Sequence, residues 1–271
     1  MTKTLNNYLR THRKHARLSQ RDVARALGQK CGTVVSKHET NERVPHLDTA
    51  LAYEALFRVP VRQLFQGRFE KVERRVRASS RALGMGAKGS GPGKSIPTPN
   101  RPFTRILSLA PHTKGLGYAV FEGPERLVDW GFLEVRPKQR ADVALRVQVL
   151  LHRYQPAHLV GEDPNDPKSR RSPAIKALIK RITSRARARR IPPVTFTGGE
   201  VRDAFAATRA KTKHEIAIIL ASRYPQISHR RPANRRRTPW KSEDTRMPLF
   251  WAVALGVSYY HHREGWEPRP R

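Results

Sequence analysis

Apolar residues in the first 67 positions recur at intervals of three or four, the spacing of an amphipathic helix. Leu5 with Leu9, and Val23 with Leu27, are pairs of this kind, and the same spacing continues over 47–64. These intervals predict four or five short helices. We therefore expect an all-α bundle at 1–67.

The pattern weakens over 68–103. The first half, FEKVERRVRASSRAL, can extend a helix, whereas the second half is rich in Gly, Ser and Pro and can bury almost nothing. We expect a basic linker over this stretch.

From about residue 104 the period changes to short apolar or alternating runs, ILSLA, GYAVFE and LVDWGFLEV. Such runs, separated by Gly, Pro and charges, predict three strands. ADVALRVQVLLHRY has a helical apolar face, and AHLVGE reads as a buried strand. A helix over 172–189, a strand over 194–197 and an apolar helix from about 242 to 261 follow. The order predicts an α/β domain with a mixed sheet over 104–265.

Charge narrows the function. The chain has 54 Lys and Arg against 22 Asp and Glu, a formal net charge of +32, which indicates a polyanionic partner such as nucleic acid. No apolar run reaches the roughly 20 residues of a membrane span, so we expect a cytoplasmic, nucleoid-associated protein without a membrane partner. A single cysteine, Cys31, excludes an internal disulfide and a multi-cysteine zinc site.

The segment LSQRDVARALGQKCGTVVSKHE carries the signals of two consecutive helices. Ser19 can cap the first helix, with Asp22 where a capping box has its acid, and Gly28 can end it. The second helix, at about 32–38, starts with short side chains, which would let its backbone approach a major groove.

This region resembles the XRE-like DNA-binding domain of the lambda Cro and repressor type over about residues 3–66. The resemblance is carried by Leu9, Arg13, LSQ at 18–20, VARALG at 23–28, VSKHE at 35–39, Pro45 and VPVRQLF. It implies binding to double-stranded DNA and an internal ion pair between Arg13 and Glu39; a homodimer is compatible with it. The turn after Gly28 is one residue longer than is usual in that family.

The DNA contacts expected from this resemblance are Gln20, Arg21, Gly32, Thr33, Val34, Ser36, Lys37 and Arg43. The alternative is a helical bundle that uses the same fold for protein contacts.

The second region, with ILSLAPHTKGLGYAVFEG, LVDWGFLEV, LVGEDP and SEDTRMPLFWAVALG, resembles the RuvC-type Holliday-junction resolvases of the ribonuclease-H-like superfamily over about 104–262. That family holds two divalent metals with an Asp in the first strand, a Glu at the end of the fourth strand and an Asp pair on the last helix. Glu162 matches the fourth-strand acid. Ala110 stands in place of the first acid, and Pro248 and Trp251 in place of the last two. The resemblance therefore implies the fold without an intact metal site, and we expect no cofactor.

A rearranged metal site is the alternative. A Mg²⁺- or Mn²⁺-dependent endonuclease could use Glu162, Asp163, Glu243 and Asp244, with Glu162 and Asp244 as metal ligands, if these acids surround one small volume. Asp166 lies on the same loop as Asp163. The competing interpretations are that Glu162 is a solvated or ion-paired strand end, and that Glu243 and Asp244 complement the positive end of a helix dipole.

Three basic runs, at 168–172, 181–190 and 229–237, could line a strand-binding face. The phosphate contacts expected there are Arg170, Arg171, Arg185, Arg187, Arg189, Arg190, Arg235, Arg236 and Arg237. Trp240 could stack on a base. Branched DNA and RNA remain partners that such a face can bind. The sequence thus predicts a regulatory or architectural DNA-binding protein whose second domain does not cut DNA.

Overall fold

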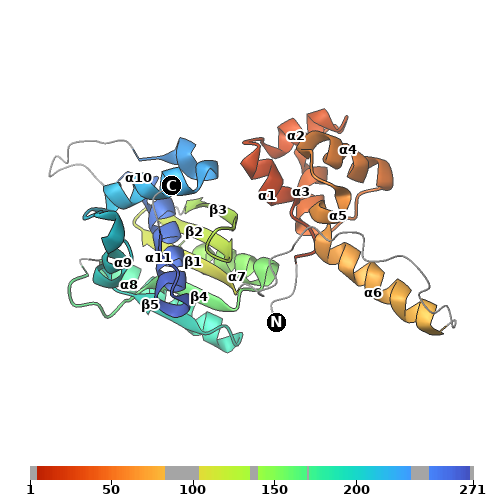
Figure 1. The fold of residues 1–271 in the computed structure, drawn as a ribbon. Helices are drawn as coiled ribbons and strands as arrows, with labels where there is room; N and C mark the ends of the chain where they lie inside the picture. Colours follow the sequence, from red (N-terminus) through yellow and green to blue (C-terminus); the bar gives the residue numbers. More distant parts are fainter. Residues whose placement is uncertain (1–4, 83–103, 135–139, 170, 233–243, 269–271) are drawn as a thin grey trace. The chain divides into compact units, whose positions relative to one another are not determined.

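The computed structural model describes residues 5–82, 104–134, 140–169, 171–232 and 244–268. The chain divides into two compact units, Met1–Pro102 and Phe103–Arg271. Figure 1 labels the elements of both. In the part of the chain that is described, no helix is both long and apolar enough to cross a membrane.

In the first unit, all regular secondary structure among the described residues is helical. Its helices are α1 (Leu9–His15), α2 (Gln20–Ala26), α3 (Gly32–Thr40), α4 (Leu47–Phe57), α5 (Val61–Leu64) and α6 (Gln66–Ala82). Leu9, Val23, Val35, Tyr53 and Leu64 are nearly inaccessible to solvent and form its core. The first five helices fall within the segment for which the spacing predicts a bundle, and α6 continues through the first half of the expected linker.

Local signals set both ends of α2. The Ser19 hydroxyl accepts the Asp22 N–H at 3.1 Å, and the Asp22 carboxylate accepts the Ser19 N–H at 2.8 Å. This is the capping box that the sequence predicts, and these hydrogen bonds lower the pKa of Asp22. After α2, Gly28 adopts φ +66°, a left-handed conformation that glycine takes without strain.

The second unit is built on a five-stranded sheet. Its strands are β1 (Arg105–His112), β2 (Gly115–Glu122), β3 (Leu127–Glu134), β4 (His158–Glu162) and β5 (Pro193–Phe196). The order across the sheet is β3-β2-β1-β4-β5; β1 to β3 pair antiparallel, whereas β4 is parallel to both β1 and β5. The predicted mixed sheet and the order βββαβ are confirmed.

The helices of this unit cover both faces of the sheet. They are α7 (Arg140–Tyr154), α8 (Pro173–Ala188), α9 (Gly198–Asp203), α10 (Lys213–Arg223) and α11 (Met247–Glu264), with short 3-10 turns at Ala206–Thr208 and Pro225–Arg230. In Figure 1, α11 runs across the sheet, and it is buried from Met247 to Tyr260. It begins later than the predicted start near 242.

Alternation along β1 assigns the two faces. Ile106 and Ala110 belong to the core that contains α11, whereas Leu109 lines a small cavity with Ile179 and Ile182 of α8. Successive side chains on a strand point to opposite faces, so α11 and α8 lie on opposite sides of the sheet. The carboxyl end of β4 therefore lies between two helical layers.

Candidate nucleic-acid-binding sites

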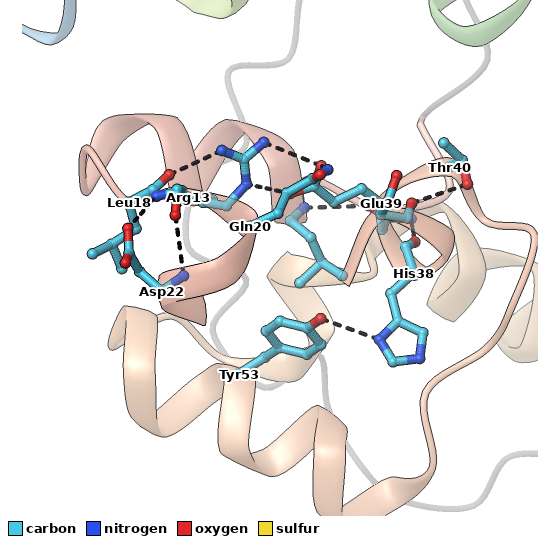
Figure 2. A network of polar contacts seen from close by, with 12 residues as sticks. Arg13, Leu18, Gln20, Asp22, His38, Glu39, Thr40 and Tyr53 are labelled. Atoms are coloured by element: carbon cyan, nitrogen blue, oxygen red, sulfur yellow. Dashed lines mark hydrogen bonds and ion pairs between the residues drawn. The ribbon is translucent and has the colours of Figure 1, made fainter. Parts of the chain in front are cut away.

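The inner face of α3 is fixed by a polar network, shown in Figure 2. Arg13 Nε donates to Glu39 Oε1 at 2.5 Å, and Arg13 Nη2 donates to Glu39 Oε2 at 3.2 Å. Arg13 Nη1 also donates to the Leu18 carbonyl at 2.9 Å. The ion pair implied by the resemblance is confirmed, and the contacts of Arg13 connect α1 with α3 and with the segment just before α2.

Gln20 belongs to the same network. Its Nε2 donates to Glu39 Oε2 at 2.9 Å. Gln20 is one of the expected DNA contacts, and in this arrangement its amide is already engaged within the bundle. Its position at the start of α2 makes the network continuous from α1 to α3 (Figure 2).

A second contact holds α3 to α4. His38 Nδ1 lies 3.1 Å from the Tyr53 hydroxyl, and both residues are buried. Burial lowers the pKa of His38 and raises that of Tyr53, in each case by disfavouring the charged form. The pair is therefore neutral near physiological pH.

The outer face of α3 presents its polar side chains to solvent. Thr33 and Lys37, one helical turn apart, are exposed, as is Arg43 beyond the helix; Val34 and Ser36 are half-buried. Arg21, at the start of α2, is also exposed. These residues form the outward surface of the α2–α3 pair, where the sequence predicts DNA contacts.

Gly32 has a different environment. A Cβ added to Gly32 would lie 3.2 Å from the backbone nitrogen of Arg21 and 3.2 Å from the carbonyl carbon of Gln20. The glycine therefore permits close packing of α3 on α2, whereas the sequence pattern suggested close approach of the backbone to DNA.

In the second unit, Glu162 ends β4 and is paired with an arginine. Arg171 Nε donates to Glu162 Oε2 at 2.9 Å and Arg171 Nη2 donates to Glu162 Oε1 at 2.7 Å, with side-chain exposures of 14% for Glu162 and 20% for Arg171. Both carboxylate oxygens accept from one guanidinium, the bidentate geometry of a strong pair. Glu162 is therefore an ion-paired strand end, one of the two interpretations that the sequence left open. Arg171, one of the expected phosphate contacts, is engaged in this pair.

The neighbouring acids order turns. Asp163 accepts the Asn165 N–H at 2.9 Å, Asp166 accepts the Lys168 N–H at 2.8 Å, and Asp244 accepts the Arg246 N–H at 2.9 Å. Glu243 lies outside the described residues. Across the described ranges, no three His, Cys, Asp or Glu side chains are grouped so as to hold a metal ion.

Ala110, Pro248 and Trp251, the positions at which the resemblance expects acids, are buried. Ala110 is fully buried and pairs with Gly117 of β2. A Cβ on Gly117 would lie 2.0 Å from the Pro248 carbonyl oxygen, so the start of α11 rests directly on the sheet there. Lys213 Nζ lies 4.4 Å from the centroid of the buried Trp251 ring. Ala110 and Trp251 belong to the same buried core, and none of the three residues carries a carboxylate.

The structure describes only part of the three basic runs. Arg187, Arg189 and Arg190 are exposed near the end of α8, while Arg185 is half-buried and its Nη1 has no hydrogen-bond partner among the described residues. The expected contacts Arg170, Arg235, Arg236 and Arg237, together with Trp240, lie outside the described residues.

A pocket of about 370 Å³ lies beside this end of α8. It is lined by Asp163, Pro164, Asn165, Lys180, Thr183, Arg187, Pro193 and Thr195. Lys180 was missed at the level of the sequence, where runs of adjacent charges were the criterion. The signal was its place opposite the buried Ile175, Ile179 and Ile182 on an amphipathic helix.

A mixed sheet with β1 to β3 antiparallel, β4 and β5 parallel to β1, and helices on both faces defines the α/β class of the second unit. Its described acids do not assemble a metal site.

Several solved structures are similar to the C-terminal part of this chain. RuvC of Thermus thermophilus in complex with a Holliday junction substrate is 17% identical with a TM-score of 0.44, over 60% of this chain and 96% of that one. A second Thermus thermophilus RuvC structure gives the same identity and TM-score over 59% and 96%. The yeast mitochondrial Holliday junction resolvase is 10% identical with a TM-score of 0.40, over 60% and 80%. No family model matches the sequence, and no curated protein matches it.

Proposed function

We propose that this chain is a double-stranded DNA-binding protein with a regulatory or architectural role. In it, the α2–α3 pair of the first unit is the helix-turn-helix that reads duplex DNA, and the second unit contacts nucleic acid without cutting it. The observation that carries the proposal is the division of α3 into a locked inner face and an exposed polar outer face with Thr33 and Lys37.

The chemistry of α3 suits a major groove. A recognition helix needs a fixed orientation and short or long polar side chains that reach base edges and phosphates. The Arg13–Glu39 pair and the His38–Tyr53 contact supply the fixed orientation. Lys37 supplies a cation beside Thr33, and the net charge of +32 supplies long-range attraction to phosphate.

The second unit supports a binding role on different grounds. Cationic side chains lie beside two of the positions at which a nuclease of the resembled family would have acids. Arg171 is ion-paired with Glu162, and the Lys213 ammonium lies over the Trp251 ring. A two-metal site needs several free carboxylate oxygens, since each hard cation prefers oxygen ligands. These residues do not fit a metal pair, whereas Lys180 and Arg187 offer charge to a phosphate backbone.

The test is a binding titration with labelled duplexes, after selection of a preferred site from random DNA. Affinity should fall steeply between about 50 and 200 mM salt, because each neutralised phosphate releases counterions. Lys37→Ala should weaken binding to the preferred site by about 1–2 kcal/mol and affect random duplex less. Duplex RNA and a four-way junction are measured in parallel.

Arg74→Ala is the matched control, because it removes one exposed positive charge from α6 and leaves the α2–α3 surface unchanged. This variant should weaken binding to all duplexes slightly and to the same extent. If affinity barely responded to salt, or if the two variants behaved alike, the assignment of α3 as the reading helix would be wrong. Tighter binding to duplex RNA than to duplex DNA would indicate that RNA is the ligand.

The second candidate function is a Mg²⁺- or Mn²⁺-dependent endonuclease. It is favoured by one observation, the placement of Glu162 and Asp163 together at the end of β4. A cleavage assay on four-way junctions with each metal distinguishes the two functions. We expect no cutting; metal-dependent cutting that Glu162→Gln abolishes would establish the endonuclease, and cutting that survives in this variant would indicate a contaminating nuclease.

A further inference from the structure

Helix α6 carries an apolar stripe between Phe69 and Val76 that is partly exposed to solvent. Phe65, just before the helix, is buried, but Phe69, Val72 and Val76 are 39%, 43% and 54% exposed. The Arg62 guanidinium carbon lies 4.5 Å from the centroid of the Phe69 ring and covers one side of it. A short helix without packing is marginally stable in water, so α6 would gain stability from a partner along this stripe.

The spacing of the apolar residues in the stripe indicates how a partner helix would pack on α6. Phe69, Val72 and Val76 are separated by three and then four residues, the a and d positions of a heptad. Phe65 falls on the preceding d position and connects the stripe to the core. We propose that α6 forms a parallel two-stranded coiled coil with α6 of a second copy of this chain, so that the protein is a homodimer.

Charge complementarity favours a second copy in parallel orientation. With Phe69 at a, Arg68 occupies g and Glu73 occupies e. In a parallel pair in register, g of one helix faces the following e of the other, so Arg68 meets Glu73 of the second copy twice by symmetry. An antiparallel pair would instead place Arg68 opposite Arg75, both at g. Glu73 also contacts Arg77 on its own helix at 3.0 Å, but that pair is exposed and weak.

The dimer itself does not depend on the proposed function, although its consequence for DNA does. A two-fold axis along paired α6 helices would relate two α2–α3 surfaces, and symmetric readers bind sites with two half-sites. Two copies of a +32 chain repel each other, so dimerisation without DNA should strengthen with salt. DNA binding has the opposite salt dependence.

Sedimentation velocity of the full chain without DNA tests the proposal, at about 0.5 M NaCl to screen repulsion. We expect conversion of monomer to dimer with rising concentration. Val72→Lys should raise the dimer dissociation constant about tenfold or more, because it places a charge in the seam. Ala78→Lys is the control: it adds the same charge to the same helix, at an exposed position off the stripe. Circular dichroism checks that both variants fold.

Two further variants test orientation. With Cys31 replaced by serine, Val76→Cys should cross-link two copies on oxidation and Ala78→Cys should not. Glu73→Arg should weaken the dimer, and adding Arg68→Glu should restore it.

A monomer at every concentration, or equal effects of the two lysine variants, would overturn the proposal. So would failure of Val76→Cys to cross-link. Because the assay contains no DNA, such a failure leaves the test of DNA binding intact.

Discussion

Each unit contains a bidentate arginine–glutamate pair, and the two pairs lie in different places relative to the proposed sites. In the first unit, Arg13 and Glu39 lie behind α3, with side-chain exposures of 11% and 1%. They orient the helix and leave its outer residues available. In the second unit, Arg171 occupies both carboxylate oxygens of Glu162 at the end of β4.

The two pairs have similar geometry, and they differ in what surrounds them. The Arg13–Glu39 pair leaves the outer face of α3 exposed, whereas the Arg171–Glu162 pair engages the carboxylate that the second candidate function would need. Substitutions at Ala110, at Glu39 and Glu162, and at His38 test these differences. The expected losses of stability decrease in that order.

Ala110→Asp should destabilise the second unit by about 3 kcal/mol or more, because it places a carboxylate in a fully buried position under α11. Ala110→Asn has nearly the same size without the charge and should cost less. All four tryptophans follow residue 103, so their fluorescence during denaturation reports on this unit. A stable Asp variant that acquires metal-dependent cleavage would show that the acid position is open and the packing argument is wrong.

Glu39→Gln should destabilise the first unit by about 3 kcal/mol, since it leaves the mostly buried Arg13 without its charged partner. Glu162→Gln should cost about 1 kcal/mol, because Arg171 can turn toward solvent. Hydrogen exchange of peptides from α1 to α3, and of β4 with α8, measures the two effects separately. Equal losses would remove the distinction between the two pairs.

The pH dependence should be the smallest effect. Burial lowers the folded-state pKa of both His38 and His158, and the unfolded value is about 6.5. The unfolded chain therefore binds more protons in this range, so both units should lose stability as pH falls from about 7 toward 5. His38→Gln should flatten the response of the first unit, measured by circular dichroism in urea. His15→Gln, at an exposed position, should not; equal flattening by the two variants would mean that His38 is not the responsible group.

Local features of the fold were predictable from the sequence, because each depends on residues that are neighbours in the chain. The capping box of Ser19 and Asp22, the left-handed Gly28 and the helix over 172–189, observed as Pro173–Ala188, are of this kind. The order of elements along the chain, βββαβ, followed from the periodicity of apolar residues alone.

The features that decide the sites depend on contacts between distant segments or across a loop. The pairing of Glu162 with Arg171 requires the loop between them to fold back, and one adjacent basic residue of KSRRS could not be distinguished from another. The engagement of Gln20 by Glu39 and the packing of Gly32 on α2 likewise depend on how two helices meet. The absence of a carboxylate at Ala110 was visible in the sequence, but the close contact between Gly117 and Pro248 was not.

The burial of α11 has a consequence for biosynthesis. This helix covers the face of β1 and β2, yet it follows them far along the chain. While the ribosome is still translating 247–260, that face of the sheet lacks its main covering helix, and core side chains such as Ile106 and Phe121 are more accessible to other chains. The first unit, by contrast, closes its core within the first 65 positions and can fold early. The second unit is thus the part of the nascent chain that most needs a chaperone until α11 emerges.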